Sequence, residues 1–282
     1  MEIKRVGVIG AGQMGAGIAQ VCASIGKVVT LCDIKQDFVD NGIASISKNL
    51  QRSVSKDRIS QKQMDDTLAN VSTSLENKDL SNCDIIIEAI IEDVDIKKNL
   101  FSSLGDICDE RTILASNTSS IPIGILADAS GREDKVVGMH FMNPVPVMKL
   151  VEVIRAKSTS DDTFDTTFKL AEDLHKVPVL VNDFPGFVSN RILLPMLNEA
   201  IFCVMEGVAE PEAIDTVMKL GMSHPMGPLT LADFIGLDTC LAIMRVLHKD
   251  MNDDKYRPCP LLEEMVSKGK FGRKSGEGFY KY

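Results

Sequence analysis

Two residue types in the segment from 140 to 152 could exchange a proton with a substrate. The segment reads HFMNPVPVMKLVE, so His140 and Glu152 stand at its two ends. A histidine titrates near neutral pH and accepts or donates a proton at little cost. A carboxylate that accepts the second ring N–H fixes the tautomer and stabilises the imidazolium. The pair is therefore a candidate acid–base pair, provided that the turn at residues 144–146 folds Glu152 back onto His140.

A glycine-rich loop near the start of the chain could bind a dinucleotide. It follows a segment at residues 4–9 that is predicted to be a buried strand, and it opens a helical pattern at 13–25. In such a loop the first glycine allows the turn, the second lets the backbone approach a pyrophosphate, and the third lets helix pack on strand. The pyrophosphate then binds N–H groups at the helix N-terminus. The residues expected to bind it are Gly10, Gly12, Gln13, Met14 and Gly15.

Asp33 follows the next apolar run, residues 28–32. A carboxylate at this place suits the two hydroxyls of an adenine ribose and repels a 2′-phosphate. The sequence therefore favours NAD over NADP. Lys35 lies close enough in sequence to keep NADP as the less favoured alternative.

The elements that must position these residues alternate along the first two thirds of the chain. Further apolar runs lie at 85–87, 112–115, 136–139, 149–154 and 177–181, with helical stretches such as 96–104 and 163–175 between several of them. Strands that alternate with helices predict a parallel, doubly wound, Rossmann-like sheet. The polar, helical interval from 36 to 68 is too long for a minimal βαβ unit and predicts an inserted helical pair.

The alternation stops near residue 184, and the rest of the chain has a helical pattern. Helices are expected over 187–208, 210–221, 229–247 and 260–268, the first of them kinked at Pro195. We therefore predict an α/β dinucleotide-binding domain over residues 1–184 and an all-α domain over residues 185–282.

Composition excludes several classes of function. The chain has 282 residues and a net charge of -9, which argues against general nucleic-acid binding because that needs a basic surface. No apolar run reaches the length of a membrane span. The N-terminus enters a strand pattern directly, so we expect a cytoplasmic protein without a signal peptide. The seven cysteines are scattered, which predicts reduced thiols and no metal site.

Six motifs together give the chain a family resemblance. They are GVIGAGQMGAGIAQ at 7–20, ASNTSS at 115–120, the segment 140–152, PGFVSNR at 185–191, HPMGP at 224–228 and GRKSGEGFY at 272–280. With these motifs the chain resembles the short-chain L-3-hydroxyacyl-CoA dehydrogenases, and most of all the bacterial 3-hydroxybutyryl-CoA dehydrogenases of butyrate and butanol metabolism. The resemblance runs from end to end of the chain.

The resemblance implies a role for each matching residue. His140 would be the general base that removes the 3-hydroxyl proton of 3-hydroxybutyryl-CoA while hydride leaves C3, giving acetoacetyl-CoA. Glu152 would pair with it, and Ser119 and Asn190 would hold the substrate oxygens. The matching residues on the nicotinamide side of the cofactor are Glu92, Lys97, Asn117, Ser119, Asn143 and Lys274.

The resemblance also assigns the inserted helical pair to the coenzyme A tail and implies a homodimer. Arg52 and Lys56 then become candidates to meet the anionic nucleotide of coenzyme A. A solvated amphipathic helix is the competing interpretation of this segment. Three other functions stay open: an NADP-preferring enzyme for the same reaction, a dehydrogenase of a free hydroxy acid or sugar acid, and an NAD-binding module without turnover.

Overall fold

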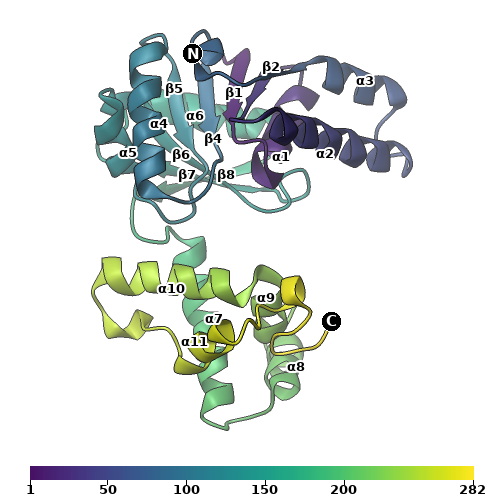
Figure 1. Ribbon diagram of the computed structural model, residues 1–282, viewed down its shortest axis with the longest axis vertical. Helices are drawn as coiled ribbons and strands as arrows, with labels where there is room; N and C mark the ends of the chain where they lie inside the picture. The colour runs from purple at the N-terminus through teal and green to yellow at the C-terminus, as the bar shows by residue number, and fades with distance from the viewer. The chain divides into compact units, whose positions relative to one another are not determined.

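A computed structural model describes residues 1–282 as two units, Met1–Asp183 and Phe184–Tyr282 (Figure 1). The first unit is built on an eight-stranded sheet with the order β3-β2-β1-β4-β5-β6-β7-β8. Its strands are β1 Arg5–Ile9, β2 Val28–Cys32, β3 Val71–Ser74, β4 Ile85–Glu88, β5 Ile113–Ser116, β6 Val136–Phe141, β7 Leu150–Arg155 and β8 Val177–Asn182. The strand order reverses between β1 and β4, which is where doubly wound sheets bind their ligands.

Helices cover this sheet, and its central strands are therefore buried. Every residue of β4, β5 and β6 is buried, as continuous apolar runs in such sheets require. The helices are α1 Gln13–Ser24, α2 Gln36–Val54, α3 Gln61–Ala69, α4 Val94–Ile107, α5 Ile123–Ser130 and α6 Asp161–Asp173, with short 3-10 turns η1 Asn77–Leu80 and η2 Glu133–Lys135. The pair α2 and α3 extends away from the sheet, as Figure 1 shows.

The predicted doubly wound sheet is confirmed, with one correction to its expected parallel course. All neighbouring strands run parallel except β6 and β7, which are antiparallel. The reason is the length of the connection at residues 142–149, because a parallel crossover needs about a dozen residues or more. The short edge strand β3 was not predicted, since its sequence VSTS has no apolar run.

The second unit is all-helical, as predicted. Its elements are α7 Ser189–Met205, α8 Pro211–Gly221, α9 Pro228–Ile235, α10 Leu237–Met251, α11 Pro260–Ser267 and the 3-10 turns η3 Asp254–Tyr256 and η4 Arg273–Ser275. The single helix expected over 229–247 is wrong: Gly236, with φ +105°, separates α9 from α10. That backbone conformation cannot continue a helix. No helix in either unit combines the length and apolarity that a membrane crossing requires.

Candidate active site

The carboxyl ends of four neighbouring parallel strands lie side by side and carry most of the residues that the sequence singled out. Ile9 of β1 is level with Cys32 of β2 and with Glu88 of β4. Glu88 is in turn level with Ser116 of β5. The residues that follow these strand ends, among them the glycine loop, Asp33 and Asn117, therefore meet at one edge of the sheet.

The three glycines of the loop differ in what requires them. At Gly10, with φ +100°, a Cβ would lie 2.5 Å from the carbonyl oxygen of Ala89. At Gly15 a Cβ would lie 1.7 Å from the carbonyl oxygen of Gly10, so the close approach of α1 to β1 excludes any side chain. At Gly12 a Cβ would meet nothing within 4 Å. Gly12 thus borders open space at the N-terminus of α1, where no side chain caps the helix, and this fits a pyrophosphate.

Asp33 and the glycine loop border one cavity of about 480 Å³. One oxygen of the Asp33 carboxylate accepts a hydrogen bond from the N–H of Ala11 at 2.6 Å, and the other accepts from Ile34 N–H at 2.7 Å. These bonds hold the carboxylate beside the loop. The cavity is lined by Gly10, Ala11, Gly12, Asp33, Ile34, Phe38, Asn41, Ala89, Ile90, Ile91 and Ile96, so apolar side chains predominate. An apolar cavity with one fixed carboxylate fits an adenosine.

His140 and Glu152 face each other across the antiparallel pair β6 and β7. The two residues are direct partners in the register, and His140 Nδ1 lies 2.7 Å from Glu152 Oε2. Their exposed fractions are 8% and 2%. The turn that brings them together is closed at the Pro144 carbonyl, which accepts hydrogen bonds from the N–H groups of Val147 and Met148, both at 3.0 Å. A carboxylate beside Nδ1 favours the tautomer that carries its proton on Nδ1, which assigns proton exchange with a substrate to Nε2.

Two asparagines bond the segment that carries His140. The Asn117 side-chain oxygen accepts from the N–H of Phe141 at 2.9 Å, next to His140. The Asn143 side-chain oxygen accepts from the Gln13 amide at 3.0 Å, which ties the turn after β6 to the start of α1. Asn117 thus bonds the strand that carries His140, and Asn143 links the turn after that strand to the glycine loop. Met14 packs against the core of this unit.

Ser119 lies in a turn that Glu92 holds. Glu92 Oε1 accepts from the Ser119 N–H at 3.0 Å, and the Ser119 hydroxyl lies 3.4 Å away. Glu92 Oε2 lies 2.9 Å from the ammonium of Lys97. Burial raises the pKa of Glu92, but Lys97 and the hydrogen bonds from Thr118 and Ser119 outweigh it, so the pKa stays below the usual 4.5.

Glu88 was not predicted as a site residue, although it is fully buried and lies 2.8 Å from the Lys97 ammonium. A signal for it was present, since a single carboxylate ends the apolar run of β4. A charged residue at the carboxyl end of a buried strand needs a partner. The hydroxyls of Thr118 and Ser120, which also bond Glu92, were missed because serine and threonine occur in most loops.

The remaining predicted site residues lie elsewhere on the chain. Arg52 is exposed in the last turn of α2, and Lys56 is exposed just after that helix. Asn190 is buried near the start of α7, and Lys274 forms an ion pair with Asp238 within the helical unit. The roles predicted for these four residues in binding the substrate or the cofactor stay predictions.

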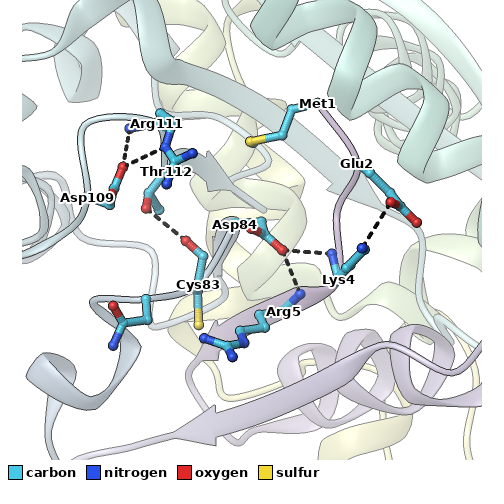
Figure 2. Close-up of a pocket in the computed structure, with 10 residues that line it drawn as sticks. Met1, Glu2, Lys4, Arg5, Cys83, Asp84, Asp109, Arg111 and Thr112 are labelled. Atoms are coloured by element: carbon cyan, nitrogen blue, oxygen red, sulfur yellow. Dashed lines mark hydrogen bonds and ion pairs between the residues drawn. The ribbon is translucent and has the colours of Figure 1, made fainter.

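A second cavity, shown in Figure 2, lies at the amino ends of β1, β4 and β5, the opposite edge of the sheet. Several of its charged groups are paired locally: the Asp84 carboxylate accepts from the N–H groups of Lys4 and Arg5 at 2.7 and 2.8 Å, and Arg111 pairs with Asp109. Such pairing is typical of a structural strand edge. No group of three or more histidine, cysteine, aspartate or glutamate side chains is placed to hold a metal ion.

Comparison with known proteins points to one family. The model of the 3-hydroxyacyl-CoA dehydrogenase NAD binding domain matches residues 5–184, and that of the C-terminal domain matches residues 186–282. A probable 3-hydroxybutyryl-CoA dehydrogenase of Deinococcus radiodurans is 60% identical, over 99% of this chain and 100% of the relative. The 3-hydroxybutyryl-CoA dehydrogenase of Bradyrhizobium diazoefficiens is 50% identical, over 99% and 96%. The crystal structure of (S)-3-hydroxybutyryl-CoA dehydrogenase from Ralstonia eutropha superposes with a TM-score of 0.98 at 48% identity, covering 100% of this chain and 99% of that one.

Proposed function

Because the chain belongs to the 3-hydroxyacyl-CoA dehydrogenase family, we propose that it catalyses the reversible oxidation of (S)-3-hydroxybutyryl-CoA to acetoacetyl-CoA with NAD. The observation that carries the proposal is the buried 2.7 Å contact between His140 and Glu152, in the same unit as the glycine loop. The names of the relatives that cover almost the whole chain support the four-carbon substrate.

In this proposal His140 is the general base for oxidation and the general acid for reduction. Its Nε2 takes the proton of the 3-hydroxyl, and Glu152 stabilises the imidazolium that results. The bound nicotinamide supplies the acceptor for the hydride that leaves C3. Ser119 and Asn190 hold the substrate oxygens, since a hydroxyl and an amide orient an oxygen without competing for the proton.

The preference for NAD rests on Asp33. Its carboxylate is held at the carboxyl end of β2 by two backbone N–H groups. A 2′-phosphate placed there would meet a fixed negative charge. Lys35, the cation that could offset this charge, has its ammonium 5.5 Å from the centre of the Phe38 ring, a cation–π distance. Since the Lys35 ammonium interacts with the Phe38 ring, we propose that it does not offset the charge of Asp33 and that NADPH is therefore the poorer cofactor.

The test is reduction of acetoacetyl-CoA by the wild type and by His140→Gln, each with NADH and with NADPH. Loss of the general acid should lower kcat by about 100- to 10,000-fold. Equal rates for the two proteins would refute the role of His140, and a clear preference for NADPH would refute the role of Asp33. Turnover of free 3-hydroxybutyrate at the rate of its coenzyme A ester would favour the hydroxy-acid alternative.

We further infer that the coenzyme A tail binds at the α2–α3 pair and that the chain forms a homodimer through its helical unit. Arg52 and Lys56 are exposed cations on a chain of net charge -9.

On the helical unit Val217, Leu220 and Met222 are exposed, with Leu220 at 81%. Burial of these apolar side chains would favour self-association. Sedimentation at micromolar concentration tests the dimer, and a single monomeric species would refute it.

A further inference from the structure

The turn at residues 116–121 is held by a charged network in the interior of the first unit. Its outermost member is Glu92, whose side chain is 37% exposed. Glu92 Oε1 accepts from the Thr118 hydroxyl at 2.6 Å and from the N–H groups of Ser119 and Ser120 at 3.0 and 3.1 Å. Three donors of the turn, among them the Ser119 N–H, thus converge on this one oxygen.

The next member, Lys97 in α4, fixes the other oxygen of Glu92. The Lys97 ammonium lies 2.9 Å from Glu92 Oε2 and 2.8 Å from Glu88 Oε1. The Lys97 side chain is only 1% exposed. Because Lys97 has so little exposed surface, its charge can influence the turn through the two carboxylates that it contacts.

The innermost member, Glu88, connects the ammonium to the other end of the turn. Glu88 Oε1 also accepts from the N–H of Ile90 at 2.8 Å, and Oε2 accepts from the Ser116 hydroxyl at 2.6 Å. The same Ser116 hydroxyl accepts from the N–H of Thr118 at 3.2 Å. Two carboxylates that share one ammonium thus hold the turn from both sides.

These charges depend on one another. Glu88 is fully buried, so without the ammonium its charge would be uncompensated in a low-dielectric interior. Without Glu88, in turn, nothing in the core would anchor the ammonium opposite Glu92. We propose that Glu88 and Lys97 are positioning residues that set the place of the Ser119 hydroxyl through Glu92. The inference rests on the proposed function, in which that hydroxyl binds the substrate oxygen.

The experiment is a cycle of variants measured by acetoacetyl-CoA reduction with NADH. The double variant Glu88→Gln with Lys97→Met removes one charge of each sign, so neither of the two fully buried positions keeps an unpaired charge, while Glu92 stays partly exposed. Ser119→Ala is introduced into the wild type and into this double variant. Glu92→Leu serves as a second background, because it removes both acceptor oxygens on the exposed side of the network while Lys97 keeps Glu88 as its partner. Lys98→Met, at the exposed neighbouring lysine of α4, is the matched control.

If the network positions Ser119, the loss of kcat in a combined variant should be smaller than the product of the losses in its separate variants. Ser119→Ala should lower kcat about 100-fold in the wild type, as loss of one oriented donor does. In either background the same substitution should lower kcat less than about threefold, because the hydroxyl is already misplaced. The KM for acetoacetyl-CoA, the affinity for NADH and the thermal unfolding midpoint are measured in parallel. Lys98→Met should leave kcat unchanged.

Other results overturn the inference. A full loss for Ser119→Ala in both backgrounds means that the network supports only the fold. A rise in the NADH dissociation constant with kcat unchanged means that Lys97 serves the cofactor directly. No effect of Ser119→Ala in the wild type removes the basis of the inference while leaving the dehydrogenase function standing. Absence of acetoacetyl-CoA reduction by the wild type, by contrast, refutes the proposed function itself.

Discussion

Replacement of Glu152 by glutamine isolates the contribution of one buried charge to proton transfer. Glutamine has nearly the shape of glutamate and can place its carbonyl oxygen where Glu152 Oε2 lies, 2.7 Å from His140 Nδ1. The hydrogen bond then survives, and the negative charge beside the developing imidazolium is lost. Because both side chains are almost fully buried, solvent screens this charge poorly.

The size of the effect follows from the strength of such a bond. A hydrogen bond to a charged group contributes about 1.5–3 kcal/mol and a neutral one about 0.5–1.5 kcal/mol, so loss of the charge alone costs about 1–1.5 kcal/mol. At about 1.36 kcal/mol for each tenfold change in rate, Glu152→Gln should lower kcat for 3-hydroxybutyryl-CoA oxidation about 5- to 13-fold. Affinity for NAD should stay unchanged, since Glu152 lies on β7 and the glycine loop follows β1.

The assay is the formation of NADH under saturating substrate, with the unfolding midpoint of each protein measured alongside. Glu133→Gln, the same exchange at an exposed position just before β6, is the control and should leave kcat unchanged. A kcat for Glu152→Gln equal to that of the wild type would refute the electrostatic role. If the loss of activity instead matched a loss of folded protein, Glu152 would be a structural partner of His140 only.

Three further predictions follow from the site. Gly12→Ala should weaken NADH binding with little change in the unfolding midpoint, whereas Gly15→Ala should destabilise the fold, because only the latter Cβ meets the backbone. Arg52→Ala combined with Lys56→Ala should raise the KM for acetoacetyl-CoA and leave NADH affinity unchanged, which steady-state kinetics and fluorescence titration measure. The pKa of Glu92 is held below 4.5, so the stability that its ionised form contributes is present above that pH and lost as the pH falls through the lowered value. Glu92→Gln should therefore be less stable than the wild type at neutral pH, by a margin that shrinks during acid denaturation.

Each of these predictions has a result that contradicts it. Equal unfolding midpoints for Gly12→Ala and Gly15→Ala would contradict the different packing of the two glycines. Arg58→Ala, an exposed cation of the same segment, controls for net charge, and an equal rise in KM there would mean that no local clamp exists. A stability difference for Glu92→Gln that stays constant down to strongly acidic pH would show that the carboxylate charge contributes nothing.

Much of the sheet could be predicted from sequence because its strands are buried on both faces. Apolar runs at 28–32, 85–87 and 136–139 fall on β2, β4 and β6, where burial selects the side chains directly. The polar strand β3 was not predicted because it lies at the sheet edge, where hydrogen bonds to β2 rather than burial of apolar side chains define it. The break at Gly236 was missed for a related reason, since the apolar pattern continues through it and only the backbone angle marks the end of α9.

Side-chain partnerships between distant segments were harder to predict than the elements themselves. Glu88, Glu92 and Lys97 are close in sequence, but their partners at 116–120 arrive from the next strand and its turn. Sequence spacing within a helix or strand gives no information on such contacts, because they depend on how two strands are aligned. The motif at 115–120 drew attention through Ser119, whereas the neighbouring hydroxyls supply most of the bonds that hold the turn.

The antiparallel pairing of β6 and β7 brings the two residues of the acid–base pair together. Side chains on a strand alternate between the two faces, so a shift of one residue in register would turn Glu152 away from His140. Antiparallel pairing through the short turn at 142–149 sets the register, and the bond from Phe141 N–H to Asn117 fixes β6 against the end of β5. A parallel crossover would have carried β7 away from the turn and brought its first residues beside the start of β6 instead. The one departure from the expected parallel sheet is thus the feature that places a carboxylate 2.7 Å from the histidine.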